Sequence, residues 1–461
     1  MLAALLGACA SREGIAPRAA ALAPASVGLH DKARIDWPAE QWWRRYQDPT
    51  LDALVERALA DNPSVAVAAA RLARAESVAE FADANRGPQV NAALDSTRQR
   101  YTENGLVPKP LAGTIATSNA LLLNAGWEID LFGRNRATLD AALGSARAAE
   151  ADLQAARVLL ATQVVRVWFE LGRLTAQRAV TAQTLLQQDR TAALVRARAE
   201  AGLDTRGTLR TAEAGPPEAR RQLAALDERI AQARNALAAL TIQTPAALGQ
   251  TTPALSAASG IALPDQIPAD LLGRRGDIVA ARWRVEAALR ERDAAQAQFY
   301  PNINLAAFVG FSSLGASRWF ESGSAVFGAG PAIRLPIFEA GRLRANLKGR
   351  TAEIDTAIQQ YNSTVTEAVR EVADHVAALK ALGEQATEQA KAQRAAEDAH
   401  ALAGERHRAG LDNALAVLRA QGAVLAQQAV AVDIRARALD LDAGLARALG
   451  GGIPLRAPEA R

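Results

Sequence analysis

The chain has 461 residues, of which 49% are hydrophobic, only 4% aromatic and 22% charged. The formal net charge is +4, and basic and acidic residues are interspersed, which indicates solvated helix faces and argues against a nucleic-acid-binding protein. A single cysteine, Cys9, excludes a disulfide framework and a cysteine-based zinc site.

The N-terminus is a short apolar run that ends in Leu6-Gly7-Ala8-Cys9. It resembles a lipoprotein signal, in which residues 1–8 are removed and Cys9 becomes the acylated terminus. No basic residue precedes Cys9, although a signal peptide begins with positive charge, and we therefore expect the true start to lie upstream. A free cysteine in a frayed terminus is the alternative. No later stretch approaches the roughly 18 consecutive apolar residues of a membrane-spanning helix.

The first half of the chain alternates between helix and strand patterns. After an extension over residues 9–62, helix is predicted from Ser64 to about Asn85, where Gly87-Pro88 ends it. The next stretch alternates apolar and polar residues as a half-exposed strand does, and a second such stretch, TSNALLLNAGWEIDLFG, follows a polar loop. Residues from about Asn135 to Ala201 favour helix without a proline, which predicts a rod of about 100 Å.

The motif AGLD at 201–204 turns the chain into a return helix that is predicted to end near Thr241. Gly202 permits the positive φ that ends a helix, and Asp204 is predicted to cap the first turn of the return helix. Gly215-Pro216-Pro217 lies early in that helix. Two missing N–H donors there should kink or break the helix at a cost of about 3 kcal/mol or more.

The same order of patterns recurs in the second half. Pro88 corresponds to Pro301 in "AQFYPNINL", two strand-like stretches follow, and a second rod runs from Arg342 to a second AGLD at 409–412. The return helix is predicted to end near Leu449. We interpret the chain as a tandem duplication of helix, two strands, long helix, corner and return helix. The predicted divisions are repeat 1 at 63–244, an equatorial linker at 245–275, repeat 2 at 276–449 and a tail at 450–461.

Two strand pairs supply four strands of about ten residues, which can cross a bilayer only within a closed barrel. Four strands cannot enclose a pore, because bacterial outer-membrane barrels begin at eight. The strands must therefore be pooled between chains if the protein is a membrane barrel. Candidates for an aromatic girdle, with ordinary strand packing as the alternative, are Phe308, Phe311, Trp319, Phe320 and Phe327.

This order, together with "DPTLDALVERALADNP", "LPDQIPADLLGRRGDIVAAR", "LPIFEAGRLR" and the two AGLD corners, resembles the TolC-type outer-membrane efflux family, in its NodT-like lipoprotein branch. The resemblance implies an α+β membrane protein of the Gram-negative outer membrane. Its long helical hairpins would form a periplasmic tunnel, and its four strands would join a twelve-stranded barrel of a homotrimer. The tunnel would receive drugs or other small molecules from a periplasmic adaptor and an inner-membrane RND-type pump. The only added group would be the lipid on Cys9.

The family's functional positions map onto the two corners. The Arg-x-x-x-Gly-Leu pattern recurs at Arg198 and Arg406, which makes the tips candidate adaptor-docking points, and their residues are Gly202, Leu203, Asp204, Gly410, Leu411 and Asp412. Leu415 and Arg419 fall where family members narrow the periplasmic gate. Arg419 departs from an acidic residue that is common there, and it would either face the trimer axis unpaired or pair with Asp412 or Glu405. A second departure is Gly276 of "RRGDI", where the family usually has proline; a helix start tolerates either.

Two other classes of protein fit less well. An enzyme is disfavoured because the sequence has no H-E-x-x-H, G-x-S-x-G or phosphate-binding loop motif. No metal site is predicted, because His400 and His407 are seven residues apart on one predicted helix. A structural or adhesive coiled-coil outer-membrane lipoprotein without a channel is the remaining alternative. The helices are not cleanly heptad-patterned, however, and such a protein would leave the two strand pairs unexplained.

Overall fold

The computed structural model describes residues 12–30, 35, 37–249, 251–255, 266–339 and 341–452. Cys9 and the predicted signal 1–8 lie outside the described residues. The described chain forms two compact units. Unit 1 holds 12–21, Arg71–Glu150 and Ala280–Asn362, and unit 2 holds Leu22–Ala70, Ala151–Val279 and the residues from Ser363 onward.

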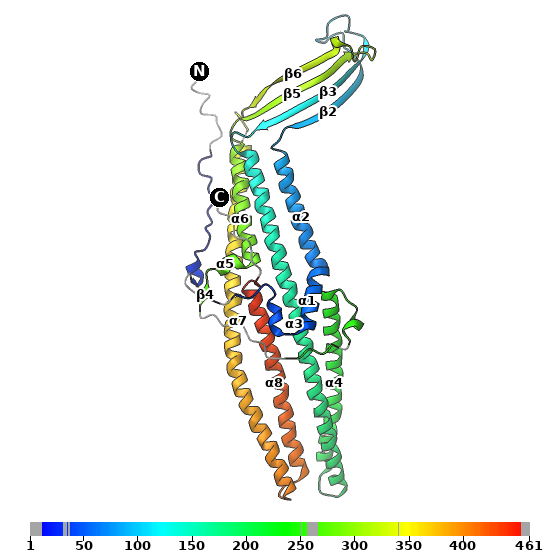
Figure 1. The fold of residues 1–461 in the computed structure, drawn as a ribbon, viewed down its shortest axis with the longest axis vertical. Coiled ribbons are helices and arrows are strands. Elements are labelled where there is room, and N and C mark those ends of the chain that lie inside the picture. Colours follow the sequence, from blue (N-terminus) through cyan, green and yellow to red (C-terminus); the bar gives the residue numbers. More distant parts are fainter. Residues whose placement is uncertain are drawn as a thin grey trace. The chain divides into compact units, whose positions relative to one another are not determined.

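The elements of the first half appear in Figure 1 from dark blue to green. They are η3 (Pro24–Val27), β1 (Leu29–His30), η4 (Trp42–Tyr46), α1 (Pro49–Asp61), α2 (Pro63–Ala84), β2 (Gln89–Arg100), β3 (Ile115–Ile129), α3 (Arg134–Glu200) and α4 (Arg206–Thr241). Those of the second half are η5 (Pro245–Leu248), β4 (Ile267–Pro268), α5 (Leu271–Arg274), α6 (Gly276–Ala297), β5 (Asn302–Leu314), η6 (Ser322–Ser324), β6 (Ala325–Arg334), α7 (Arg342–Arg408) and α8 (Ala414–Ala448).

The long helices match the predicted rods closely. The helices α3 and α7 each contain 67 residues, and α2 and α6 each contain 22. At 1.5 Å per residue, α3 and α7 are each about 100 Å long. The order helix, strand, strand, long helix, return helix occurs twice along the chain, as the sequence pattern indicates.

Unit 1 is built on a four-stranded antiparallel sheet of order β2-β3-β5-β6, with helices α2, α3, α6 and α7 adjoining the strands in sequence (Figure 1). The central pairing joins the two halves of the chain, from Ser118 opposite Leu314 to Ile129 opposite Ile303. Within the described part of the chain, β2 and β6 each pair on one side only. The sheet therefore has two open edges with unpaired backbone groups.

The two faces of this sheet differ in polarity. Paired residues share a face, and successive residues alternate between faces. One face carries large apolar side chains that are 50–82% exposed: Val90, Leu94, Leu123, Val309, Phe327 and Ile333. The other face carries mainly polar or small side chains, including Gln89, Asn91, Asp95, Thr97, Asn124, Asn302 and Asn304. In the described part of the single chain, no other helix or strand packs against the apolar face of the sheet, and its side chains are exposed.

The proposed aromatic girdle is wrong for one of its members. Phe308 lies opposite Asn124 and Gly328, on the polar face, because it is one residue away from the apolar-face positions of β5. Phe320 packs edge-on against Phe311 at 5.6 Å between ring centroids and stacks on Trp319 at 5.2 Å. Phe327 remains 82% exposed on the apolar face.

The N-terminal segment of unit 1 lies along α7. The backbone N–H groups of Arg18 and Ala19 both donate to Oδ1 of Asp355 at 2.8 Å. Further along the segment, the Asn362 amide donates to the carbonyl of Ala20 at 3.0 Å. At its other end, the Arg12 guanidinium lies 5.4 Å from the ring centroid of Tyr300, next to the start of β5. These contacts place Arg12 at the end of the sheet where the helices begin.

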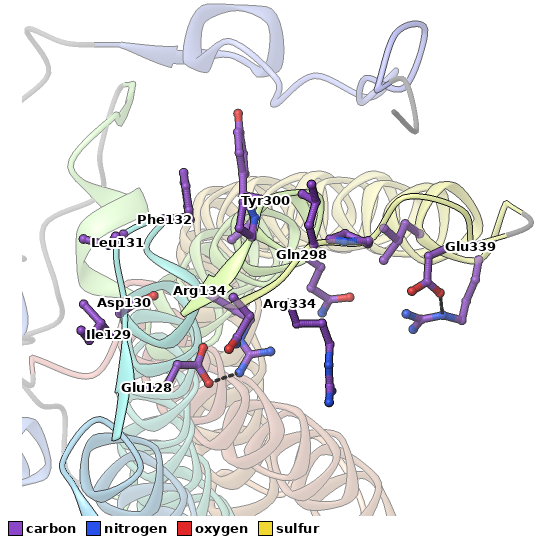
Figure 2. A pocket seen from close by; sticks show the side chains of 17 residues that line it. Glu128, Ile129, Asp130, Leu131, Phe132, Arg134, Gln298, Tyr300, Arg334 and Glu339 are labelled. Carbon is purple, nitrogen blue, oxygen red and sulfur yellow. Dashed lines mark hydrogen bonds and ion pairs between the residues drawn. The ribbon is translucent and has the colours of Figure 1, made fainter. Parts of the chain in front are cut away.

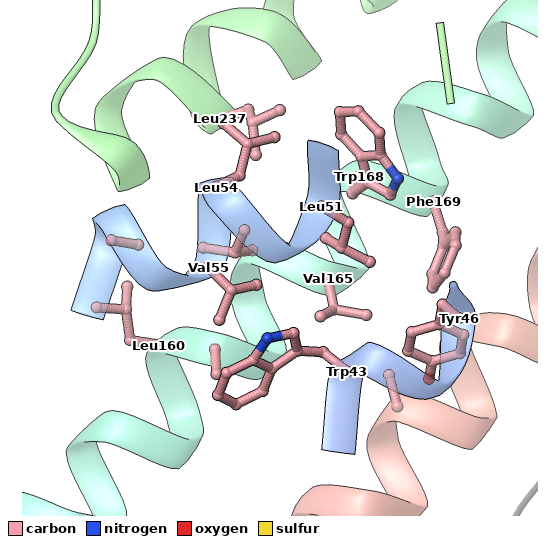
Figure 3. Close-up of a cluster of buried hydrophobic side chains, with 14 of the residues drawn as sticks. Trp43, Tyr46, Leu51, Leu54, Val55, Leu160, Val165, Trp168, Phe169 and Leu237 are labelled. Carbon is pink, nitrogen blue, oxygen red and sulfur yellow. The ribbon is translucent and has the colours of Figure 1, made fainter. Parts of the chain in front are cut away.

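Unit 2 has an aromatic core around α1, α3 and α8, shown in Figure 3. Tyr46 packs edge-on against Phe169 at 4.8 Å, and Trp168 is 1% exposed. The indole N–H of Trp168 donates to Asp48 at 2.9 Å, and the same carboxylate caps α1 by accepting from the Thr50 N–H at 3.0 Å. One aspartate therefore fixes both the start of α1 and its position on α3.

Helix α4 continues through Gly215-Pro216-Pro217, so of the two predicted outcomes, a kink or a break, the break is wrong. Two ion pairs hold α4 against α3 on either side of the prolines. Arg196 of α3 pairs with Glu213 at 2.9 Å, and Arg220 pairs with Asp189 of α3 at 3.1 Å. Pro216 itself is buried. Packing against a neighbouring helix thus offsets the two lost backbone hydrogen bonds.

Gly276 is required by a close backbone approach, which corrects the expectation that this helix start tolerates either glycine or proline. A Cβ at Gly276 would lie 2.7 Å from the Ala151 carbonyl oxygen and 3.0 Å from the Ala155 nitrogen of α3. Its neighbour Arg275 is 5% exposed and pairs with Asp277 at 2.7 Å. The same guanidinium pairs with Glu371 at 2.8 Å, which ties the start of α6 to α7.

Gly276→Ala is therefore expected to lower the free energy of unfolding by about 1–3 kcal/mol, because the added methyl group must push α6 away from the α3 backbone. Thermal unfolding followed by circular dichroism measures the effect. Gly349→Ala in α7 is the matched control, since its Cβ would meet nothing within 4 Å. That variant should be neutral or slightly more stable. Equal midpoints for wild type and Gly276→Ala would contradict the close approach.

Candidate functional site

The two corners have the same backbone geometry. At the first corner, Gly202 has φ +75°, and the Leu203 N–H donates to the Arg198 carbonyl at 2.8 Å. At the second, Gly410 has φ +72°, and the Leu411 N–H donates to the Arg406 carbonyl at 2.9 Å. Both are Schellman motifs, which require a residue that tolerates positive φ. The prediction that the two glycines end their helices through a positive φ is confirmed.

The caps predicted at Asp204 and, at the equivalent position of the second corner, Asp412 are wrong by one residue. Thr205 caps α4 by accepting from the Thr208 N–H, and Asn413 caps α8 by accepting from the Ala416 N–H, each at 3.1 Å. Asp204 instead accepts from Arg198 at 2.7 Å across the corner. An N-cap is the last non-helical residue before a helix. In both corners that residue is the one after the aspartate, because the turn includes the aspartate itself.

The charged groups at the two corners differ in their pairing. The hydrogen bond from Arg198 lowers the pKa of the Asp204 carboxyl, and the positive charge of Arg419 lowers it further. At the second corner, Asp412 pairs with Arg406 at the longer distance of 3.7 Å. The Asp412 carbonyl oxygen also lies 3.0 Å from Nδ1 of His407. The ion pair across the first corner is therefore about 1 Å shorter than the ion pair across the second.

Each corner presents one exposed leucine. Leu203 is 66% exposed and Leu411 is 69% exposed. In a Schellman motif the residue at this position usually packs back on its own helix. Both leucine side chains instead remain largely exposed at the tips of the helical hairpins.

Leu415 and Arg419 differ in exposure although they are four residues apart on α8. Leu415 is 8% exposed, whereas Arg419 is exposed. Neither of the predicted pairs of Arg419, with Asp412 or with Glu405, forms within the described chain. The electrostatic neighbour of Arg419 is Asp204, on the other hairpin. The guanidinium thus has no ion-pair partner within the described residues.

Gln187 makes a buried contact beside the predicted gate positions that the sequence did not reveal. Its amide N–H donates to the Leu418 carbonyl of α8 at 2.8 Å, and the side chain is 5% exposed. The contact holds α3 against α8 between the positions of Leu415 and Arg419. A single glutamine within a long polar helix carries no sequence signal of burial.

A cavity of about 210 Å³ lies in unit 1, at the junction between the strands and the helices. Polar side chains line part of it, as Figure 2 shows. Glu128 pairs with Arg134 at 2.5 Å. Arg334 lies on the same face of the sheet as Glu128, because Arg334 is opposite Asn302, Glu128 is opposite Asn304, and the two asparagines share that face. Phe132 stacks on Tyr300 at 4.7 Å, on the other side of the junction in Figure 2.

Length and composition alone would let one helix of the described chain, α8 (Ala414–Ala448), cross a membrane. This is weak support for a helical span, since a core helix passes the same test. Several α8 side chains, among them Leu439 and Ala443, belong to the aromatic core of unit 2.

The chain matches the family model for the outer membrane efflux protein over residues 54–241 and 267–451. The multidrug resistance outer membrane protein MdtQ of Escherichia coli O6:H1 is 35% identical over 426 residues, which cover 90% of this chain and 88% of that protein. The fusaric acid resistance protein FusA of Burkholderia cepacia is 38% identical over 322 residues, which cover 69% of this chain and 61% of that protein.

Two solved structures show the same fold. The outer membrane protein VceC of Vibrio cholerae superposes with a TM-score of 0.81 at 36% identity, over 90% of this chain and 100% of that chain. The outer-membrane channel OprN gives a TM-score of 0.83 at 27% identity, over 96% and 99% of the two chains.

The chain belongs to the outer membrane efflux protein family. It is an outer-membrane efflux channel with a periplasmic portion, and the family consists of channels that work with a periplasmic adaptor and an inner-membrane pump. The family resemblance seen in the sequence is therefore confirmed.

Proposed function

We propose that three copies of the chain close a twelve-stranded barrel in the outer membrane, and that their helical hairpins form a continuous periplasmic tunnel. Drugs or other small organic molecules pass through it without an energy source of their own. An inner-membrane RND-type pump and an adaptor deliver them to the corner end. The names of the relatives, multidrug resistance and fusaric acid resistance, support cargo of this kind.

The sheet of unit 1 is the observation that carries this proposal. One face is apolar and exposed, the other is polar, and β2 and β6 are open edges. Backbone groups at an edge cannot remain unpaired in lipid, so a spanning sheet must close. Four strands are too few to close alone, and β6 of one copy can pair with β2 of the next in antiparallel fashion. An apolar outer face and a polar inner face are what such a barrel requires.

Conductance of the purified protein in a planar bilayer tests the proposal. We expect discrete, stable channel openings and a mass in detergent of three chains. A structural or adhesive lipoprotein without a channel would bind the bilayer and leave its conductance unchanged. That result, or a monomeric mass with an intact fold, would contradict the proposal.

The acylated N-terminus of the mature protein is Cys9. Cys9 lies outside the described residues, but only two residues stand between it and Arg12, and these three steps span about 11 Å of extended chain at most. Arg12 contacts Tyr300 at the end of the sheet, so the chain length lets an acyl group reach the membrane surface there. One acyl chain binds a membrane only marginally, and two or three are therefore expected.

Mass spectrometry of membrane-extracted protein is expected to show two or three acyl chains on Cys9. Cys9→Ser should reduce the yield of membrane protein more than it reduces export per channel, because the barrel is the main anchor. Arg12→Gln, which keeps the cysteine, should retain the lipid. An unmodified Cys9 in the extracted protein would contradict the assignment.

The two tips are the adaptor-docking points, and Leu415 and Arg419 form the periplasmic gate. The exposed Leu203 and Leu411 support the docking role, since apolar tips at equivalent corners suit a repeated contact. The exposed guanidinium of Arg419 supports a charged ring at the tunnel mouth.

A further inference from the structure

Phe308 is the only aromatic residue on the polar face of the sheet, among the strands that the structure describes. It lies near the middle of β5, between Asn124 of β3 on one side and Gly328 of β6 on the other. Many positions of the same face carry very small residues, and these include Ala93, Ala120, Gly126, Ala306, Gly330 and Ala332. A large aromatic ring therefore lies on a face whose other side chains are mostly small or polar.

The ring of Phe308 packs against the backbone of Gly328. A Cβ at Gly328 would lie 2.8 Å from both Cε1 and Cζ of Phe308, which is closer than van der Waals contact allows. The Phe308 side chain is 44% exposed, so the sheet covers part of it and leaves the rest open. An aromatic side chain that covers a glycine on the neighbouring strand is a known device of β-sheets. The ring can lie over β6 only because position 328 has no side chain.

The other neighbours of the ring differ from Gly328. Asn124 has a side chain, and its amide donates to Oδ1 of Asn91 at 3.5 Å. A ring turned toward β3 would therefore lie on top of a side chain and extend further from the sheet. At Gly330, two residues along β6 on the same face, an added Cβ would meet nothing within 4 Å. The close contact thus belongs to the pair Phe308 and Gly328. Because both residues are in one chain, it does not depend on how the copies are joined.

The polar face becomes the wall of the lumen once the proposed barrel closes. Barrels of about eight strands enclose a space that side chains fill, whereas those of about sixteen leave an open aqueous channel. A twelve-stranded barrel lies between these limits. The bore of its lumen therefore depends on how far the side chains extend from the wall, and the Phe308 rings of three copies lie at the same height.

We propose that Phe308 and Gly328 together set the bore of the barrel, and with it the size of the molecules that pass through. Gly328 allows each ring to lie against the wall, which keeps the lumen wide at the height of Phe308. The proposal rests on the proposed channel function, because the polar face lines a lumen only in a closed barrel.

Thiol labelling from outside intact cells measures the bore. A Cys9→Ser background leaves no other cysteine in the chain. Asn304→Cys then places a thiol on the same face of β5, four residues from Phe308 toward the helices. Maleimides that carry polyethylene glycol chains of increasing mass must pass the Phe308 rings to reach this thiol. Their rates are divided by the rate with N-ethylmaleimide, which corrects for the reactivity of the thiol itself.

Phe308→Ala should raise severalfold the labelling rate of the largest reagent that still enters the wild type, because it removes the ring. Gly328→Ala should lower the same rate severalfold, because the added methyl group displaces the ring from the wall into the lumen. Gly330→Ala is the matched control and should label as the wild type does. The double variant Phe308→Ala/Gly328→Ala should label as Phe308→Ala does, which separates displacement of the ring from distortion of the strand.

Equal size limits for the wild type, Phe308→Ala and Gly328→Ala would overturn the proposal. A double variant that labels as slowly as Gly328→Ala would overturn it as well. Leu123→Cys, on the apolar face of β3, tests the closed barrel in the same cells and should not react with the polymer reagents, because its side chain faces lipid. Reaction of Leu123→Cys at the rate of Asn304→Cys would remove the closed barrel and the lumen with it. An unreactive Leu123→Cys together with equal size limits disproves the role of Phe308 and leaves the channel.

Discussion

The double variant Leu203→Asp/Leu411→Asp is expected to abolish complementation of an efflux-deficient strain while leaving the assembled protein intact. Both leucines are more than 60% exposed at the C-terminal corners of α3 and α7. Their replacement should therefore not disturb the fold, whereas a partner that buries them would have to bury two carboxylates per chain. Burying an unpaired charge costs several kcal/mol, which is enough to prevent docking. Drug susceptibility and crosslinking to the adaptor measure the outcome.

Leu186→Asp is the matched control for the tip variant. Leu186 is 58% exposed on α3, well before the corner, and its replacement should leave export unchanged. Single tip variants should be intermediate, because each removes half of a repeated contact. Normal export by the double variant, with normal amounts of protein in the outer membrane, would remove the docking role of the tips.

Arg419→Asp is expected to make the channel more selective for cations. The guanidinium is exposed and without an ion-pair partner in the described chain, and arginine cannot lose its proton. In a trimer, three such groups at a spacing of about 6 Å and an effective dielectric near 20 would repel in pairs by about 3 kcal/mol. Such a ring favours anions at the mouth of the tunnel, opposite to an acidic ring at the same position.

Single-channel recordings under a salt gradient measure this selectivity through the reversal potential. The difference between wild type and Arg419→Asp should be largest at low salt and should shrink as salt increases, because the Debye length falls from about 10 Å at 0.1 M to about 3 Å at 1 M. Arg229→Asp, with the same change of charge on α4, should behave as the wild type. Identical reversal potentials for wild type and Arg419→Asp at low salt would show that Arg419 does not line the pore.

Most helix and strand positions follow from local pattern. The long proline-free run after Asn135 predicts α3 to within a residue or two, and the alternation after Pro88 predicts β2. The corner glycines are equally clear, because only a residue that tolerates positive φ fits a Schellman motif. The exposed leucines beside them follow from the family pattern, and the structure adds their exposure.

The parts of the site that were not foreseen depend on contacts between distant residues. The Asp204 carboxylate accepts from Arg198 of α3, and Thr205 therefore provides the N-cap of α4. Gln187 contacts the segment with the predicted gate positions only because α8 lies beside α3.

The sequence by itself determined the lengths and order of the elements, because the period of apolar residues, breakers and corner glycines act within a few residues. Only the tertiary structure decided whether a helix-breaking residue interrupts its helix and whether a glycine can be replaced. Helix α4 passes through Pro216-Pro217 because ion pairs and packing against α3 hold it, and Gly276 matters because the α3 backbone lies against it. The compact units likewise combine segments from both halves of the chain, since burial depends on which surfaces meet in space and not on their order in the chain.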